Sequence, residues 1–224
     1  MIGRTLRRVQ RSFRALEAKA GSRRREVRRR ALEAELGGRG ISKLNLCSGT
    51  QRVPGYFGID ILDGADLRLD LAAMDLPFPD ASVDTVVCMS AINYFSRLRA
   101  RELVHEMHRV LRTGGVCRVG VQDMKALAER YVRGDREFFF QKLPDGRERF
   151  EGPTLGDKFA AWFYGYAVEG RPCAYFYDFD SLSHLFREAG FQVIERKAYR
   201  ESRIPEVDRL DNRPDQMFFL EAGK

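Results

Sequence analysis

Residues 44–60, Leu-Asn-Leu-Cys-Ser-Gly-Thr-Gln-Arg-Val-Pro-Gly-Tyr-Phe-Gly-Ile-Asp, decide the fold of this chain. A short apolar run ends in a turn of small residues, and a second short strand follows and ends at Asp60. In a parallel sheet such a turn lets the backbone approach a ligand, and the carboxylate can accept hydrogen bonds from ribose hydroxyls. The stretch therefore predicts a nucleoside pocket at the carboxyl edge of a parallel sheet.

The spacing of this stretch argues against two other kinds of nucleotide site. A dinucleotide fingerprint has three glycines, and its acidic residue comes about 20 residues later. Here only Gly49 lies in the turn, and Asp60 follows 11 positions after it. The sequence has no Gly-Lys-Ser/Thr phosphate loop. The pattern therefore predicts no pyrophosphate site.

Three further segments continue the same pattern. Residues 67–71 resemble a short strand that ends in an acid, residues 75–80 are a turn-rich link, and residues 83–89 are an apolar run typical of a buried parallel strand. With these motifs the chain resembles the class I S-adenosylmethionine-dependent methyltransferases. It is most similar to a small branch with the motifs Leu-Asn-Leu-Gly-Cys/Ser-Gly and Asp-Leu-Pro-Phe, often linked to surface polysaccharide or glycolipid pathways. The resemblance is good over residues 43–123.

The composition predicts a soluble globular protein with a basic extension. Of 224 residues, 44% are hydrophobic and 32% are charged. Residues 1–40 hold 13 Lys/Arg and 4 Glu, a balance of +9, so that with a total of +7 the rest sums to −2. We expect a basic amphipathic helical extension over 1–40 and a methyltransferase domain over 41–224, with an aromatic insert at about 124–175. Because the body is not basic, nucleic acid is not an expected partner.

An apolar seam with helical spacing starts the chain and is formed by Ile2, Leu6, Val9, Phe13 and Leu16. Arginines flank it, and a second helix is expected from Ser22 to Leu36. We expect residues 2–16 to contact an anionic membrane surface, with packing on the body, a dimer contact or a mitochondrial presequence as alternatives. Because no run resembles a membrane span or a signal peptide, we predict a cytoplasmic protein, peripheral at the inner face of the membrane.

The alternation of strands and helices predicts an α/β fold. The resemblance implies a three-layer sandwich around a seven-stranded, mostly parallel Rossmann-like sheet whose last strand is antiparallel. Helices are expected over Arg97–Leu111, ended by Thr113-Gly114-Gly115, and from a cap at Asp180 to Gly190. The expected strands are 43–47, 56–60, 67–69, 83–89, 115–121, 191–197 and 215–221.

The resemblance also implies the cofactor, S-adenosylmethionine, and the residues that bind it. The turn at 45–50 would pass under the methionine part, Asp60 would bind the ribose, and Asp70 with the Leu71 amide would contact the adenine. Cys47 stands where the family usually has its first glycine, and its side chain disfavours positive φ. The predicted cofactor-binding residues are Asn45, Cys47, Ser48, Gly49, Asp60, Ile61, Asp70, Leu71 and Ser90.

The acceptor is expected over the ends of the fourth and fifth strands. Tyr94 stands where the branch has a histidine; with an ordinary pKa of about 10 it is a poor base, but it can donate a hydrogen bond or stack. Asp123 is the candidate general base, and a helix N-cap is its equally weighted alternative. The predicted catalytic residues are Asp123 and Tyr94, and the predicted substrate residues are Asn93, Gln122, Tyr131 and Trp162. The last two belong to the aromatic insert, about half of which we expect to form a lid.

The expected function is methyl transfer to a small or lipid-linked acceptor, such as a sugar hydroxyl in cell-surface glycan biosynthesis. The methyl group is already activated, so the protein would mainly supply alignment and desolvation. No metal is expected, since His105 and His108 have no evident third ligand. Two alternatives stay open: a non-catalytic nucleoside-binding or scaffold protein, and a nucleic-acid methyltransferase recruited by the basic arm.

Overall fold

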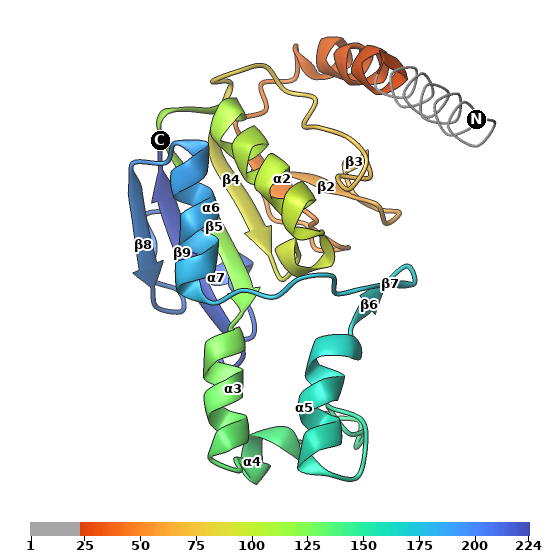
Figure 1. Ribbon diagram of the computed structural model, residues 1–224. Coiled ribbons are helices and arrows are strands. Elements are labelled where there is room, and N and C mark those ends of the chain that lie inside the picture. Colours follow the sequence, from red (N-terminus) through yellow and green to blue (C-terminus); the bar gives the residue numbers. More distant parts are fainter. Residues whose placement is uncertain (1–22) are drawn as a thin grey trace, which may run out of the picture.

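The computed structural model describes residues 23–224, and the predicted seam over 2–16 lies outside them. A helix over residues 23–36 projects from the body at the top of Figure 1, and only Leu36 of it is buried. A seven-stranded sheet in the order β3-β2-β1-β4-β5-β9-β8 follows. Its strands are β1 (Lys43–Leu46), β2 (Phe57–Asp60), β3 (Leu67–Arg68), β4 (Val83–Met89), β5 (Leu111–Gln122), β8 (Val193–Lys197) and β9 (Met217–Gly223).

The strand directions confirm the predicted sheet. Strands β1 to β5 pair in parallel, and β9 is antiparallel to both β5 and β8. Leu44 and Leu46 of β1 and Val86 and Cys88 of β4 are fully buried, as continuous apolar strands of a parallel sheet require. The carboxyl ends of β1, β2 and β4 therefore meet at one edge.

Two helices cover one face of the sheet (Figure 1). They are α2 (Arg97–Val110) and α6 (Phe179–Ala189), and their buried leucines join the main core. Two predicted helix boundaries were wrong. The cap of α6 is Asp178, which forms a capping box with Ser181, because its extended backbone leaves the side chain free to accept the Ser181 amide. Helix α2 ends at Val110, before the glycines, because the backbone turns extended at Leu111.

Gly190 ends α6 as predicted, with a φ of 102° that favours glycine. The other face of the sheet has a third layer of irregular segments. The β1–β2 connection contributes Val53 and Tyr56, and a segment over 199–212 contributes Ile204 and Leu210, within which α7 (Val207–Leu210) is a single turn. These apolar side chains pack around Val87 of β4.

A buried charge cluster ties the segment 199–212 to the sheet. Arg118 of β5 is fully buried and donates to both carboxylate oxygens of Asp211, at 2.8 and 2.6 Å. It also donates to Glu221 at 3.4 Å and to the Glu201 carbonyl at 2.9 Å. The cluster therefore holds the next residues of the chain, Asn212 and Arg213, near the carboxyl edge of the sheet.

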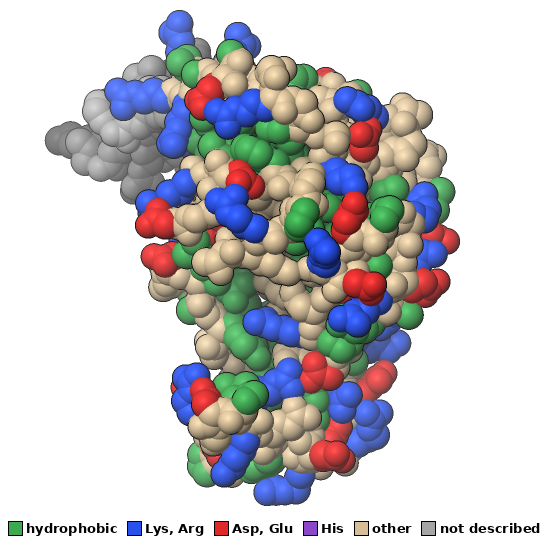
Figure 2. Space-filling model, turned by 180° about the vertical axis from the view of Figure 1, so that it is seen from behind, with side chains coloured by type: hydrophobic (Ala, Val, Ile, Leu, Met, Phe, Trp, Pro, Cys, Tyr) green, Lys and Arg blue, Asp and Glu red, His purple; other side chains and the backbone are tan. Residues whose placement is uncertain are grey.

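Residues 124–175 form a lobe below this edge (Figure 1). Helices α3 (Met124–Val132), α4 (Arg136–Phe139) and α5 (Leu155–Tyr164) surround an aromatic core of their own. A hairpin of β6 (Ala167–Val168) and β7 (Arg171–Pro172) then returns to the body. Seen from behind, the molecule is narrow where the lobe joins the body, and hydrophobic and Lys/Arg side chains both lie there (Figure 2). Within residues 23–224, no helix combines the length and apolarity that a membrane crossing needs.

Candidate cofactor site

A cavity of about 150 Å³ lies at the carboxyl edge where β1, β2 and β4 end. Aliphatic and aromatic side chains form most of its walls, and two carboxylates, Asp60 and Asp70, lie on its lining. The residues from the sequence prediction that line it are Cys47, Gly49, Asp60, Ile61, Asp70, Leu71, Ser90 and Tyr94. The β6–β7 hairpin adds Val168 and Arg171, which the sequence did not point to.

Asp60 organises the turn after β1. It is 6% exposed, and its two oxygens accept the Gly49 amide at 2.8 Å and the Leu62 amide at 2.9 Å. Gly49 has a φ of 59°, which a glycine adopts without strain. Each carboxylate oxygen can accept a second hydrogen bond. The Asp60 carboxylate is thus held in place for a pair of ligand hydroxyls.

Two cavity residues have backbone conformations that favour glycine. Cys47 has a φ of 53° and Ser90 has a φ of 54°. Left-handed backbone costs a residue with a side chain about 1–2 kcal/mol, and such strain clusters at ligand sites. A hydrogen bond with the Cys88 thiol and burial raise the pKa of the Cys47 thiol well above its usual value. The Cys47 thiol is therefore protonated at neutral pH.

Asp70 is engaged by the hairpin. Arg171 donates to its two oxygens at 2.9 and 2.8 Å, across 101 residues of sequence. This hydrogen bonding is the main cause that lowers the pKa of Asp70. The resemblance implied an adenine contact for Asp70, but the structure places the carboxylate against a guanidinium. A nucleobase that reaches Asp70 must therefore displace Arg171 or share the carboxylate with it.

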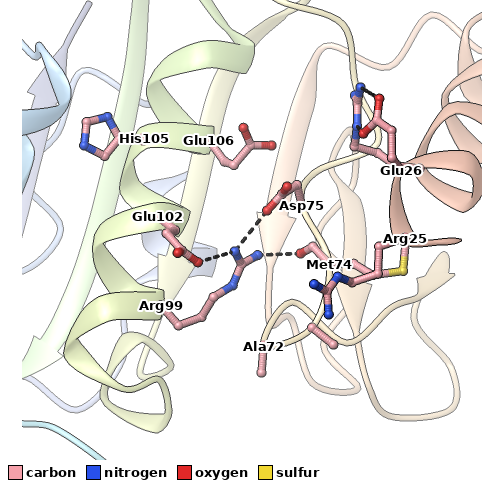
Figure 3. Close-up of a pocket in the computed structure, with 11 residues that line it drawn as sticks. Arg25, Glu26, Ala72, Met74, Asp75, Arg99, Glu102, His105 and Glu106 are labelled. Carbon is pink, nitrogen blue, oxygen red and sulfur yellow. Dashed lines mark hydrogen bonds and ion pairs between the residues drawn. The ribbon is translucent and has the colours of Figure 1, made fainter. Parts of the chain in front are cut away.

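A larger cavity of about 660 Å³ lies between the helix over 23–36, the loop over 72–75 and α2 (Figure 3). Arg99 reaches into it from α2 and donates to the Leu71 carbonyl at 2.7 Å and the Met74 carbonyl at 2.6 Å. It also pairs with Asp75 and Glu102, each at 2.9 Å. Because Leu71 lines the cofactor cavity, Arg99 fixes a wall of that cavity from behind. Sequence reasoning missed Arg99 because both carbonyls lie more than 20 positions away.

Tyr94 and Asp123, the predicted catalytic residues, are placed differently. Tyr94 lines the cavity, and burial together with the neighbouring Cys173 raises its pKa to about 12. Asp123 is 4% exposed; one oxygen accepts the Ala126 amide at 3.1 Å, and the other accepts Arg196 at 2.7 Å. Asp123 therefore has the geometry of the helix cap that was the alternative to a general base.

Asn93 and Gln122, two of the predicted substrate residues, are buried at the edge. The Asn93 Oδ1 atom and both amide atoms of Gln122 have no hydrogen-bond partner, and neither has the Tyr177 hydroxyl. Most buried polar groups in proteins are paired, so these atoms are where a bound water or polar ligand would be stabilised. They lie beyond the residues that line the cofactor cavity.

The remaining predicted residues lie outside the cofactor cavity. Trp162 is fully buried in the core of the lobe, and Tyr131 stacks on Phe159 with ring centroids 4.3 Å apart. Neither residue lines the cofactor cavity. Asn45 and Ser48 line a small separate cavity instead. Asn45 belongs to β1, and Ser48 follows Cys47, whose φ is positive.

The residues present fit S-adenosylmethionine. The fixed Asp60 carboxylate suits the ribose hydroxyls, the glycine turn allows close approach of the methionine part, and the apolar walls suit the adenine. The cavity volume is below the range of about 300–1,000 Å³ typical of ligand pockets, and the hairpin residues Val168 and Arg171 form part of its lining. Among residues 23–224, no group of three or more His, Cys, Asp or Glu could hold a metal ion.

Comparisons with known proteins found methyltransferases. Residues 59–119 match a family described as a methyltransferase domain. Demethylmenaquinone methyltransferase of Geobacillus kaustophilus is 29% identical over 175 residues, which are 75% of this chain and 64% of that protein. The chain thus spans 64% of that relative's length.

Two solved structures of S-adenosylmethionine-dependent methyltransferases are similar at low identity. The protein from Mesorhizobium loti is 14% identical, with a TM-score of 0.47 over 83% of this chain and 91% of that one. The protein from Archaeoglobus fulgidus is 12% identical, with a TM-score of 0.47 over 88% of this chain and 94% of that one.

The motifs, the matched domain and the sheet order together support a class I S-adenosylmethionine-dependent methyltransferase. S-adenosylmethionine is the cofactor of this class.

Proposed function

We propose that the protein transfers a methyl group from S-adenosylmethionine to a small or lipid-linked acceptor. The observation that carries this proposal is the Asp60 carboxylate, held by two backbone amides at one end of an apolar cavity. The cofactor supplies a methyl group that is already activated. The chain would then contribute alignment, through the Asp60 turn and the loop held by Arg99, and exclusion of water by the hairpin.

Two acceptors are candidates. The branch that the motifs resemble favours a sugar hydroxyl in cell-surface glycan biosynthesis. The Geobacillus relative, named for demethylmenaquinone, favours a lipid-soluble aromatic acceptor. Both candidates fit a lipid-linked molecule, which agrees with the basic extension and its arginine-rich helix over 23–36.

Cofactor binding tests the proposal directly. We expect calorimetry to show binding of S-adenosylhomocysteine to the wild type and a loss of about 10- to 100-fold in Asp60→Ala. The loss corresponds to charge-assisted hydrogen bonds of about 1.5–3 kcal/mol. Asp63→Ala is the matched control, because that carboxylate is 88% exposed and close in sequence. Absence of binding to the wild type up to millimolar ligand would refute the enzymatic function.

We also propose that residues 2–16 bring the protein to an anionic membrane surface. Arginines that flank the apolar seam would contact anionic headgroups, each contributing about 1 kcal/mol at low salt. Sedimentation with phosphatidylserine-containing vesicles tests this in the full chain. We expect a variant with Arg7, Arg8 and Arg11 all changed to Gln to bind the vesicles more weakly and to keep its cofactor affinity. Vesicle binding that is equal in both proteins would contradict the membrane role.

A further inference from the structure

The carboxylates near the cofactor cavity are all engaged. Backbone amides hold Asp60, Arg171 holds Asp70, and Arg196 with a helix amide holds Asp123. A general base needs a free lone pair within reach of the proton that it takes, at a pKa near the working pH. Hydrogen bonds from Arg171 lower the pKa of Asp70, which makes Asp70 a poor base for an acceptor hydroxyl. The hydrogen bonds of Asp60 and Asp123 occupy one position on each of their carboxylate oxygens.

The histidines and Tyr94 do not replace them. His105 and His108 lie on α2 and His184 lies on α6, and none of the three lines the cofactor cavity. Tyr94 does line it, but with a pKa of about 12 its hydroxyl stays protonated at neutral pH. Asp70 and Tyr94 are therefore not suited to deprotonate a neutral alcohol. An acceptor that brings its own ionised oxygen needs no such base.

Arg213 supplies a positive charge beside the cavity. The guanidinium carbon lies 5.9 Å from the centroid of the Tyr166 ring, and the side chain is exposed. The residue before it, Asn212, accepts a hydrogen bond at 2.9 Å from Ser90, which lines the cofactor cavity. Arg213 thus follows directly on a residue that contacts the cavity wall.

Two features set Arg213 apart from nearby arginines. Arg149 pairs with Asp215 at 2.6 Å and Arg196 pairs with Asp123 at 2.7 Å, whereas no acid within residues 23–224 pairs with Arg213. Its backbone has a φ of 48°, a conformation that costs a residue with a side chain about 1–2 kcal/mol. Strain of this kind is retained when the surrounding structure imposes it, as at ligand-binding sites.

Arg213 and the Tyr166 ring together offer a cation and an aromatic face next to Asn212, which accepts a hydrogen bond from the cavity residue Ser90. Burial raises the pKa of Tyr94, and the charge of Arg213 acts in the opposite direction.

We propose that Arg213 binds an anionic oxygen of the methyl acceptor, whose class is a ring carboxylate or an acidic phenol ionised at neutral pH. This inference rests on the proposed methyl transfer. The acceptor oxygen forms its new bond to the methyl carbon with its own electron pair. The breaking carbon–sulfur bond leaves its pair on sulfur, so the sulfonium becomes a neutral thioether and the oxygen becomes a neutral ester or ether. No proton has to be removed from this acceptor.

Binding of anionic probes to the full chain saturated with S-adenosylhomocysteine tests the proposal. The probes are benzoate, 4-nitrophenolate at mildly alkaline pH, and neutral benzamide. We expect one anion to bind the wild type more tightly than benzamide and to lose about 10- to 100-fold in affinity in Arg213→Gln. Arg213→Lys should lose less, because it keeps the charge without the planar fork. A preference for benzoate indicates a carboxylate acceptor, and a preference for 4-nitrophenolate indicates a phenol.

The control variant is Arg209→Gln, an exposed arginine on the same segment, which should bind the probes like the wild type. S-adenosylhomocysteine affinity should be equal in all variants. Anion affinity that is no higher than that of benzamide, or that is unchanged in Arg213→Gln, overturns the inference. Failure of the wild type to bind S-adenosylhomocysteine is a different outcome, because it refutes the proposed methyl transfer itself.

Discussion

Arg118→Met should destabilise the protein strongly, because Arg118 is the buried cation that pairs with Asp211 and, together with Arg203, with Glu221. The side chains of Arg118, Asp211 and Glu221 are all 0% exposed. The methionine would leave Asp211 with one backbone donor, the Arg200 amide at 2.7 Å, and no buried cation. Removing one partner of a buried ion pair costs about 3–5 kcal/mol. In a chain of this size that loss lowers the Tm by roughly 6–20 °C.

Arg112→Met is the matched control for this experiment. Arg112 belongs to the same strand and pairs with Asp84 at 2.9 Å, but both side chains are 52% exposed. An exposed pair contributes about 0–1 kcal/mol, so this variant should unfold within that range of the wild type. The difference in stability between the two variants separates the effect of burying the ion pair from the effect of losing an arginine.

Urea unfolding monitored by circular dichroism measures the free energy of unfolding, and equal m-values would show that the unfolded states are comparable. Fluorescence of Trp162, the only tryptophan, reports separately on the lobe. A cost below 1 kcal/mol for Arg118→Met, or a cost equal to that of Arg112→Met, would refute the reasoning. As a further check, Arg118→Met combined with Asp211→Leu and Glu221→Leu should recover part of the loss, because no unpaired buried charge remains.

Three other outcomes are expected at the cofactor site. Cys47→Gly removes left-handed backbone strain but adds the conformational entropy of glycine to the unfolded chain. The free energy of unfolding should therefore rise by no more than about 1 kcal/mol, seen as a slightly higher Tm. A clear fall in Tm would contradict the positive φ at Cys47. Arg171→Gln frees Asp70, so calorimetry should show tighter S-adenosylhomocysteine binding; weaker binding would mean that Arg171 holds the cofactor. The Tyr94 hydroxyl stays protonated below its pKa of about 12, so pH–rate profiles of wild type and Tyr94→Phe should be parallel between neutral pH and about pH 10; a basic limb that only the wild type shows would argue for a tyrosinate base.

Local pattern was enough to predict the elements of the fold. Apolar runs over 83–89 and 215–221 place β4 and β9 within two residues of their observed bounds, because a strand buried on both faces has few polar positions. The glycine at 190 ends α6 for a reason that is equally local, the left-handed conformation. The cap of α6 was predicted at Asp180 and lies at Asp178. Both residues are aspartates, and only the extended backbone at Asp178 decides which of them caps the helix.

The cofactor cavity was predicted where its residues lie on short motifs, and missed where they lie far apart in sequence. Gly49 and Asp60 lie 11 positions apart on the same motif, which runs from the turn after β1 to the end of β2. Asp123 could be a base or a cap on sequence grounds, and Arg196, which engages it, lies 73 residues away. The aromatic insert was predicted, but its composition did not indicate that Trp162 packs in the core of the lobe.

The sequence by itself determined the order of strands and helices, the turn at Gly49 and the acid at the end of β2, because hydrophobic period and turn chemistry act between near neighbours. Only the tertiary structure decided which charges meet: Arg171 with Asp70, and Arg118 with Asp211. Those partners come from segments about 100 residues apart. Charges pair through space, and the packing of the lobe and the sheet decides which carboxylates are left for chemistry.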